Sequence, residues 1–132
     1  MAAALTPEHV KLLKEPHIGV VATLNRDGSP QITPVWVDSD GTHVIFNTAE
    51  GRVKPRNLRR DPRVAVSVFD PAKAYTRVLN VRGKAVVITQ EGAKEHIDQL
   101  SQKYMGRTPY PMHDPAHPRL IVKILPDEIT GR

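Results

Sequence analysis

The sequence predicts a mainly β protein whose strands pair antiparallel in a small closed or split barrel. Six or seven short apolar segments support this prediction, and Asp-Gly turns separate the first three of them. Most connections are too short for the crossovers that parallel strands require. The chain has 132 residues, which suffice for one domain with a hydrophobic core. We therefore expect residues 1–132 to form a single barrel domain with three short helices.

The first third of the chain predicts a helix and then a three-strand meander. Thr6, Pro7 and Glu8 combine an N-cap residue, a proline at the first helical position and an acid in the first turn. Pro16 ends this helix, because the residue before a proline disfavours the helical conformation. The predicted strands of the meander span residues 17–24, 30–38 and 43–48.

Alternation in the second of these strands predicts two faces, since successive side chains of a strand point to opposite sides. One face carries Ile32, Pro34, Trp36 and Asp38, and the other carries Gln31, Thr33, Val35 and Val37.

The second half of the chain predicts three more strands, at residues 63–69, 77–89 and 119–125. Gly83 interrupts the long middle strand and predicts a bulge or a sharp bend there. Residues 70–74 and the proline-rich segment 106–118 are predicted to be irregular. A helix is expected at residues 91–104, with a buried stripe formed by Ala93, Ile97, Leu100 and Tyr104.

The segment from Gly51 to Arg63 is the most informative part of the chain, because it packs six cations into thirteen residues. It follows a predicted strand and predicts a helix at about residues 52–60, with Pro55 in the first turn. Free N–H groups, the helix dipole and basic side chains at such a helix start all favour an anion. The sequence therefore predicts a binding site for phosphate or carboxylate groups at this point.

Bulk composition agrees with an anion-binding protein of the cytoplasm. The formal net charge is +5 and the isoelectric point is near 9.7, which favours polyanionic partners. The chain has no cysteine, which excludes disulfides and metal–thiolate sites and fits a reducing compartment. The N-terminal residues lack the basic and apolar regions of a secretory signal, and no apolar run is long enough to span a bilayer.

In their order along the chain, three motifs resemble one known family. These are the Arg-x-Lys-x-Arg-Asn-Leu-Arg-Arg-Asp-Pro-Arg-Val run, the first hairpin with its Gly-x-Pro-Gln turn, and a Val-Arg-Gly-x-Ala strand. From about residue 6 to residue 130 the chain resembles the pyridoxamine-5′-phosphate-oxidase-like split β-barrels of the FMN-binding type. Within that superfamily it is similar to the deazaflavin-dependent oxidoreductases that use coenzyme F-420.

The resemblance implies a cytoplasmic homodimer with two cofactor sites built across the subunit interface. It implies reduced coenzyme F-420 as the cofactor, with FMN as the alternative, because other members of the superfamily bind FMN and a few bind haem. The chain is short and lacks the C-terminal substrate-binding motif of the FMN oxidase itself, so oxidation of pyridoxamine phosphate is not expected.

The family motif also implies which residues hold the cofactor. Its phosphate would fall to Arg52, Lys54 and Asn57, with Arg56 beside them, since arginine binds phosphate in a bidentate manner and lysine acts as a point charge. The ring system would fall to residues of the second and third strands, namely Gln31, Thr33, Pro34, Val35, Trp36, Asn47 and Thr48. Arg59 and Arg60 are expected to be surface residues or contacts to the cofactor tail.

Hydride transfer from a deazaflavin requires mainly orientation by the protein, because the cofactor carries the chemistry. The expected substrate is a small electron-poor molecule such as a conjugated enone, a quinone or a lactone. No catalytic residue is assigned from sequence, and the side chains considered as proton donors or pocket walls are Tyr75, Tyr104, Tyr110 and His113. A metal site in the loop around His113, Asp114 and His117 is not expected, because no regular element fixes their geometry.

Two other classes of function remain open at this point. A small barrel that binds nucleic acid would explain the isoelectric point and the basic run. Aromatic residues make up only 5% of the chain, however, and the strands lack the exposed aromatic platform that base stacking needs. A structural dimer without any ligand is the third alternative. The sequence favours an oxidoreductase with no nucleic-acid partner.

Overall fold

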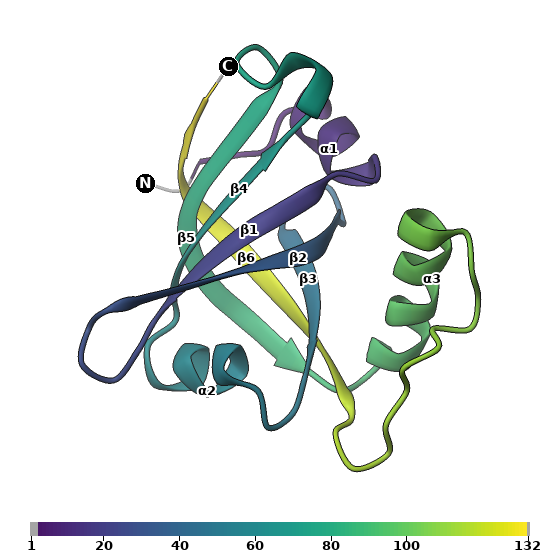
Figure 1. Cartoon of the computed structure of the whole chain (residues 1–132). Coiled ribbons are helices and arrows are strands. Elements are labelled where there is room, and N and C mark those ends of the chain that lie inside the picture. Colours follow the sequence, from purple (N-terminus) through teal and green to yellow (C-terminus); the bar gives the residue numbers. More distant parts are fainter. Residues whose placement is uncertain (1–2, 132) are drawn as a thin grey trace.

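The computed structural model describes residues 3–131 and contains the predicted antiparallel barrel. Six strands close into a ring in the order β1-β2-β3-β6-β5-β4, and every neighbouring pair is antiparallel (Figure 1). The strands are β1 (Ile18–Leu24), β2 (Pro30–Ser39), β3 (Val44–Ala49), β4 (Arg63–Phe69), β5 (Val78–Thr89) and β6 (Arg119–Thr130).

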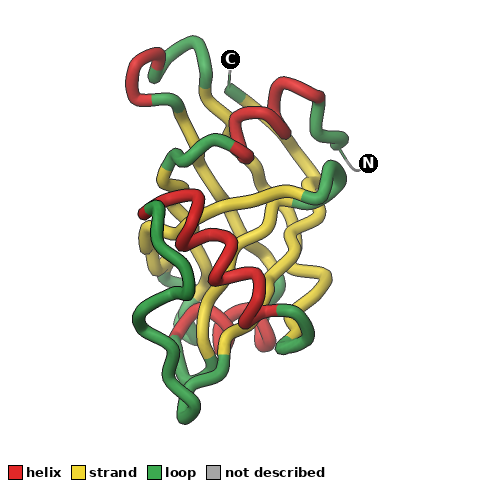
Figure 2. The backbone as a smooth tube through the Cα atoms, turned by 90° about the vertical axis from the view of Figure 1, so that its right-hand side faces the viewer, coloured by secondary structure: helices red, strands yellow, loops and turns green. Residues whose placement is uncertain are grey.

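Two helices lie at opposite ends of the barrel, and a third lies outside it (Figure 1). These are α1 (Pro7–Lys14), α2 (Val53–Arg60) and α3 (Ala93–Met105). Thr6 caps α1 as predicted, since its side chain accepts a hydrogen bond from the backbone N–H of His9. Figure 2 faces the side of the molecule on which α3 and the loop after it cover the strands.

The barrel interior is a continuous apolar core. Leu12 and Leu13 enter it from α1, and Leu58 enters it from α2 at the other end. Inward-facing residues of the strands complete it, which explains the strict alternation of buried and exposed positions in β1 and β4. In β2 the predicted faces are confirmed, because Val35 and Val37 are buried whereas Ile32 and Pro34 are exposed.

A smaller apolar cluster lies between α3 and the barrel exterior. It contains Ile97, Leu100 and Tyr110, with Trp36 and Tyr104 packed against them. The predicted stripe of α3 is therefore confirmed, and it buries against the outside of β2 rather than inside the barrel.

Residues 70–74 form the expected loop between two strands, and within it η1 (Pro71–Lys73) is a short 3-10 helix capped by the side chain of Asp70. One prediction about the chain path was wrong. The last strand was expected to end at Leu125, before Pro126, yet β6 continues to Thr130. An irregularity at the predicted place explains the difference: the register shifts between Arg82 and Gly83, with Asp127 as the extra residue of β6, and a Cβ on Gly83 would collide with the Leu125 carbonyl.

Candidate functional site

The candidate site lies where β2 and β3 separate. Their ladder contains three residue pairs, from Val37 opposite Phe46 to Ser39 opposite Val44. Before Val37, β2 continues in register with β1, but it has no partner in β3 within the described part of the chain. The barrel is therefore split along this line, and unpaired backbone groups of β2 face the opening.

A hollow of about 210 Å³ fills the opening between the two strands. Its walls come from both strands, from the start of α2, from α3 and from the loop of residues 106–118. The lining residues are Ile18, Pro34, Val35, Trp36, Asn47, Thr48, Arg52, Lys54, Ile97, Tyr110, Met112 and Arg119. We call this space the split hollow.

Three cations meet at the split hollow, namely Arg52, Lys54 and Arg119. Burial lowers the pKa of the Lys54 ammonium, and the charges of Arg52 and Arg119 lower it further. Burial likewise lowers the pKa of Arg119. Among residues 3–131 no carboxylate lies within salt-bridge distance of any of the three. Positive charge is thus concentrated in a half-buried place without an anion to balance it.

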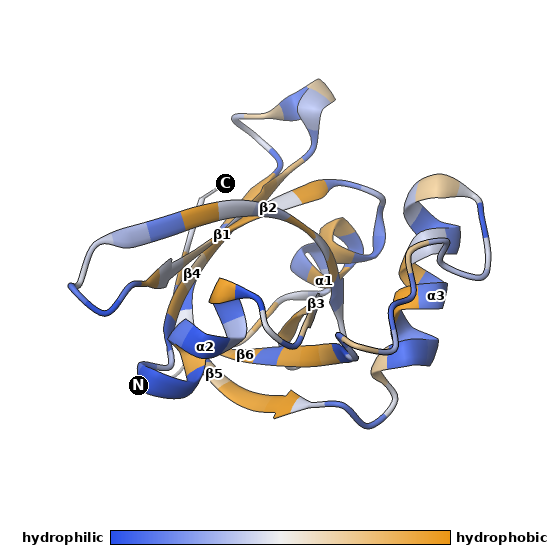
Figure 3. Cartoon of the chain, turned by 60° about the horizontal axis from the view of Figure 1, so that its bottom comes forward, coloured by the Kyte–Doolittle hydropathy of each residue, from blue (hydrophilic) through white to orange (hydrophobic). Residues whose placement is uncertain are grey.

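The remaining cations of the basic run have partners or face solvent. Arg59 forms two hydrogen bonds with the Glu50 carboxylate, at 2.7 and 3.0 Å, and Arg63 pairs with Asp61 at 2.8 Å. Arg60 donates to the Leu24 carbonyl. Figure 3 shows α2 as a mostly hydrophilic helix at the end of the barrel. Only the beginning of the basic run therefore points its charge into the split hollow.

The start of α2 itself favours an anion. Arg52 is the N-cap residue, and its side chain makes no capping hydrogen bond. The preceding Gly51 has a φ of +85°, a conformation that favours glycine and turns the chain sharply into the helix. The first N–H groups of α2 thus lie beside Arg52 and Lys54, where the helix dipole adds to their positive potential.

Arg119 is held in place by the buried amide of Asn47. The Arg119 Nε–H donates to Asn47 Oδ1 at 2.8 Å. The Asn47 amide nitrogen donates to the Ala93 carbonyl at 3.0 Å and lies 3.1 Å from Nδ1 of His96. The Arg119 guanidinium carbon also lies 5.3 Å from the centre of the Tyr110 ring, within cation–π range.

Aromatic side chains form the opposite wall of the split hollow. The rings of Trp36 and Tyr104 stack at 5.2 Å with an angle of 5°, and Tyr110 meets Trp36 edge-on at 6.0 Å. Tyr104 is locked to the backbone, because its hydroxyl accepts from the Val37 N–H at 3.0 Å and donates to the His17 carbonyl at 2.6 Å. Burial raises the pKa of Tyr104 to about 12, so this residue serves as a fixed support for Trp36.

Seven of the residues proposed from sequence meet in the split hollow: Pro34, Val35, Trp36, Asn47, Thr48, Arg52 and Lys54. Four others do not line it. Arg56 is exposed on α2, and Asn57 is buried, with its amide nitrogen donating to Thr23 Oγ1 and Asn25 Oδ1 at 3.0 and 3.1 Å. Gln31 and Thr33 lie further along the inward face of β2, and each has a buried oxygen without a hydrogen-bond partner among the described residues.

The side chains considered as proton donors fall in different places. Tyr110 lines the split hollow, whereas Tyr104 supports its aromatic wall from behind. Tyr75 is 86% exposed in the loop after η1. His113 is bonded to the Asp98 carboxylate at 2.7 Å, and Asp98 also accepts from the Tyr110 backbone N–H. Asp98 thereby holds the loop that carries Tyr110.

Sequence reasoning missed Arg119 and His96. Arg119 begins a strand after a proline-rich loop and belongs to no motif, so nothing in the sequence distinguishes it from other surface cations. A signal did exist for His96, which lies three residues after Ala93 and four before Leu100, on the buried stripe of α3. A histidine at such a position needs a polar partner inside the fold.

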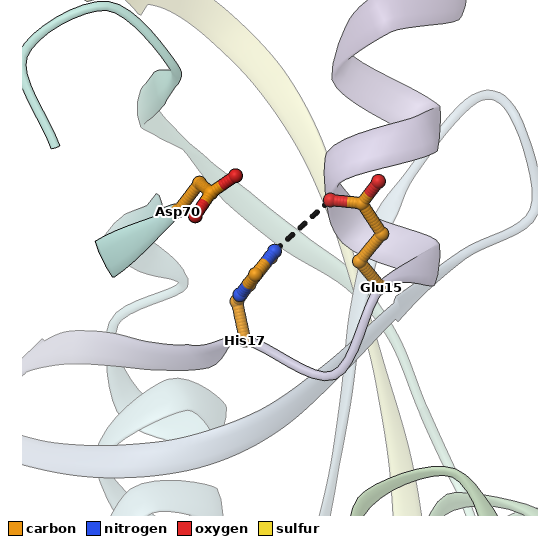
Figure 4. A group of neighbouring side chains, drawn as sticks. All are labelled: Glu15, His17 and Asp70. Carbon is orange, nitrogen blue, oxygen red and sulfur yellow. Dashed lines mark hydrogen bonds and ion pairs between the residues drawn. The ribbon is translucent and has the colours of Figure 1, made fainter. Parts of the chain in front are cut away.

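A different cluster of ionisable groups has the spacing of a metal site but is already neutralised. Ligand atoms of Glu15, His17 and Asp70 all lie within 4.8 Å of one another (Figure 4). Arg77 donates to Glu15 at 2.8 Å and to Asp70 at 2.7 Å, and His17 bonds to Glu15 at 2.9 Å. The Arg77 guanidinium thus supplies the positive charge that a metal ion would bring. We interpret this group as an ion network that joins α1, β1, β4 and β5.

Within residues 3–131, none of the helices has the length and apolar character needed to cross a membrane.

Comparison with protein families finds a match that covers residues 5–132. The matching family model is that of pyridoxamine 5′-phosphate oxidase.

Among solved structures, the chain is similar to an F420 reductase, with 34% identity and a TM-score of 0.82 over 92% of this chain and 95% of the other. A hypothetical protein of Mycobacterium tuberculosis shares 27% identity, with a TM-score of 0.73 over 97% and 84% of the two chains. HupZ of Group A Streptococcus shares 22% identity and the fold, with a TM-score of 0.67 over 96% and 93%.

Proposed function

Because the chain belongs to the pyridoxamine 5′-phosphate oxidase family of split barrels, we propose that it is an oxidoreductase of the deazaflavin branch. In this proposal it uses reduced coenzyme F-420 to transfer a hydride to an electron-poor small molecule such as an enone, a quinone or a lactone. The similarity to an F420 reductase supports this branch of the family. FMN is the alternative cofactor, and the family model alone does not favour one over the other.

The observation on which the proposal rests is the unbalanced charge at the split hollow. Arg52, Lys54 and Arg119 face it together, and burial disfavours the charged form of both Lys54 and Arg119. Lys54 and Arg119 are half-buried, and Arg52 is exposed beside them. A half-buried cation without a counter-ion costs free energy, so an anion that binds between the three would stabilise the arrangement. Coenzyme F-420 and FMN both carry phosphate.

The other walls also fit a flat ring system with polar edges. Trp36, Pro34 and Ile97 provide apolar surface, and the stack with Tyr104 keeps the Trp36 ring from turning. Thr48 is 2% exposed, and its hydroxyl has no hydrogen-bond partner among the described residues. A buried hydroxyl without a partner is unfavourable, and a ligand with a polar edge would satisfy it.

Each residue then has a defined task. Arg52, Lys54 and the first N–H groups of α2 would bind the phosphate, with Arg119 on its other side. Thr48 and the unpaired backbone of β2 would orient the ring edge, and Trp36 would exclude water from one face. When bound, the reduced deazaflavin supplies the hydride. The proton donor is left unassigned.

We further propose that the site is completed by a second copy of the chain. The split hollow of about 210 Å³ is smaller than the roughly 300–1,000 Å³ typical of small-molecule sites. It is continuous with an exposed apolar face on β1 and β2, because Ile18 and Pro34 belong to both. Ile18, Val20 and Ile32 on this face are 47%, 38% and 64% exposed.

The dimer proposal predicts that Ile32→Asp makes the protein monomeric and weakens coenzyme binding. Ile32 is largely exposed in the single chain, so the substitution costs the monomer little, but it would bury a charge in the interface. Light scattering after size exclusion measures the mass. Val86→Asp, at an apolar position on β5 that is 49% exposed, is the matched control. A dimer that persists in Ile32→Asp would contradict this interface.

Calorimetric titration of Lys54→Ala with coenzyme F-420 tests whether Lys54 binds the phosphate. Loss of one charge-assisted contact is expected to weaken binding by about 1–3 kcal/mol. Lys73→Ala removes the same charge from η1, outside the hollow, and is expected to bind like the unmodified protein. Unchanged affinity in a folded Lys54→Ala variant would mean that the basic run does not hold the phosphate.

A further inference from the structure

A chain of polar groups runs from the surface to the split hollow, and no part of it was assigned from sequence except Asn47. It begins at Lys14, whose ammonium lies 2.8 Å from Oδ1 of Asp38. Asp38 Oδ2 lies 3.2 Å from Nε2 of His96, and Nδ1 of His96 lies 3.1 Å from the Asn47 amide nitrogen. The chain ends where Asn47 Oδ1 accepts from Arg119.

The surroundings of Asn47 determine which way its amide points. Arg119 can only donate a hydrogen bond, so the amide oxygen must face Arg119. The Ala93 carbonyl can only accept, so the amide nitrogen must face Ala93. His96 lies on the same side as Ala93, and its Nδ1 therefore has to accept as well.

The histidine consequently has one favourable protonation state in this structure. With Nδ1 as acceptor, its proton is on Nε2 and donates to the Asp38 carboxylate. Burial alone would raise the pKa of Asp38, but hydrogen bonds from His96, Lys14 and the Ser39 N–H outweigh burial and keep it ionised. His96 itself is 9% exposed, so solvent does not replace these partners.

We propose that His96, in its neutral Nε2–H form, is a positioning residue that fixes the Arg119 guanidinium at the anion-binding side of the split hollow. It acts through Asn47 and touches no ligand. The proposal rests on the proposed function in one respect, namely that an anion binds beside Arg119. Arg119 uses its Nε in the bond to Asn47, which leaves the two terminal nitrogens of the guanidinium for the anion.

Acidification should disturb this arrangement. A proton on Nδ1 of His96 would turn the acceptor into a donor that faces the Asn47 amide nitrogen. The amide would then have to turn, and its nitrogen would face Arg119, where two donors repel. The charged groups near His96 are Asp38 and Lys14 on one side, Lys103 of α3 near Asp38, and Arg119 beyond Asn47. Anion affinity should therefore fall as His96 gains a proton.

The test uses nitrogen-15 NMR of the full chain and sulfate as the probe, because the charge of sulfate does not change between pH 5.5 and 8. Nitrogen shifts of His96 report the tautomer without any ligand, and the Arg119 Nε–H signal reports sulfate binding. We expect the Nε2–H tautomer at pH 8 and sulfate binding about three- to ten-fold weaker at pH 5.5, less than the loss of a whole charge-assisted contact, because Arg119 keeps its charge and loses only its fixed orientation.

Three variants distinguish a positioning role of His96 from a purely structural one. His96→Gln carries an amide that can accept from Asn47 and donate to Asp38 but does not titrate, so it should bind sulfate at pH 8 and lose the decrease at pH 5.5. His96→Ala should bind sulfate weakly at both values. His43→Gln removes a histidine that pairs with Asp40 at 2.9 Å, and it should keep the decrease.

An Nδ1–H tautomer, or an equal decrease at pH 5.5 in His96→Gln, would overturn the proposal. Absence of any Arg119 response to sulfate at pH 8 would overturn it as well. If the tautomer and the sulfate results hold but coenzyme F-420 does not bind, the cofactor assignment fails and the role of His96 stands. The two failures are therefore distinguishable.

Discussion

The two ends of the barrel treat charge in opposite ways. Near α1, Arg77 contacts both Glu15 and Asp70, so each carboxylate of that ion network has a partner of opposite charge. Near α2, Arg52 and Lys54 face the split hollow with no carboxylate beside them in the described part of the chain. A structural cluster therefore differs from a candidate ligand site in whether its charges have partners of opposite sign, and not in how many charges it contains.

The largest effect is expected from reversing the charge of Arg119. Arg119→Glu should weaken coenzyme F-420 binding at least about 100-fold, because it removes a charge-assisted contact and adds repulsion of the phosphate. Fluorescence titration measures the dissociation constant, and circular dichroism checks the fold. Lys73→Glu, with the same change of net charge outside the hollow, should bind normally. Equal weakening in both variants would show that only net charge matters.

Arg119→Gln provides a milder test of the same residue, since it keeps a donor for Asn47 and removes the charge. Its affinity should lie between that of the unmodified chain and that of Arg119→Glu. An affinity equal to that of the unmodified chain would remove Arg119 from the anion site.

Removing the cation of the ion network near α1 should lower stability and leave coenzyme binding unchanged. Arg77→Met leaves Glu15 and Asp70 close together without a cation, so the midpoint of thermal unfolding should fall. Coenzyme binding at a temperature where the variant is folded should not change. Scanning calorimetry and titration measure the two quantities on one sample. A variant that keeps its stability but loses binding would contradict the division of roles between the two ends.

The smallest effect is expected for Lys103, which forms no salt bridge with a carboxylate among residues 3–131 but donates to two backbone carbonyls. Its ammonium donates to the carbonyls of Leu13 and Val37 at 2.6 and 2.7 Å, and burial lowers its pKa to about 8 from 10.5. Between these values the unfolded chain binds more protons than the folded one, so the free energy of unfolding rises with pH. We expect a gain of about 1–2 kcal/mol from pH 8 to pH 10.5, discounted for partial exposure.

Urea unfolding at several pH values measures this change, with Lys103→Met as the reference in which the contribution of Lys103 is missing. The free energy of unfolding of the unmodified chain, minus that of Lys103→Met, should decrease as the pH is lowered. A difference that does not depend on pH would mean that the lysine is well solvated. Lys103 thus shows how a half-buried cation behaves when its partners are backbone carbonyls rather than a carboxylate.

Most of the fold was predictable because it follows local patterns. Apolar, β-branched runs bounded by turn signals identified the six strands, and the Thr6 cap and Pro16 marked the first helix. The extension of β6 past Pro126 was not predictable, because it depends on a register shift between β6 and Gly83 of β5, a residue distant in sequence. Register between distant strands has no local signal.

The site was predictable in part for the same reason. Thr48 ends a predicted strand and Lys54 belongs to the basic motif that follows it, and the structure brings both to the split hollow. Arg119 arrives there only because β6 pairs with β3, where Arg119 lies opposite Ala49. Asn57 shows the converse, since its place in the basic run suggested a ligand contact whereas its amide bonds to Thr23. Neighbours in sequence can therefore belong to different networks in space.

The most direct test of the central claim is a titration of the purified protein with coenzyme F-420 and, separately, with FMN. Trp36 is the single tryptophan and lines the split hollow, so quenching of its fluorescence reports binding at this site. We expect saturable binding of coenzyme F-420 with quenching, and weaker binding of FMN. Binding of neither at low salt, with the dimer confirmed, would contradict it and return the nucleic-acid alternative to consideration.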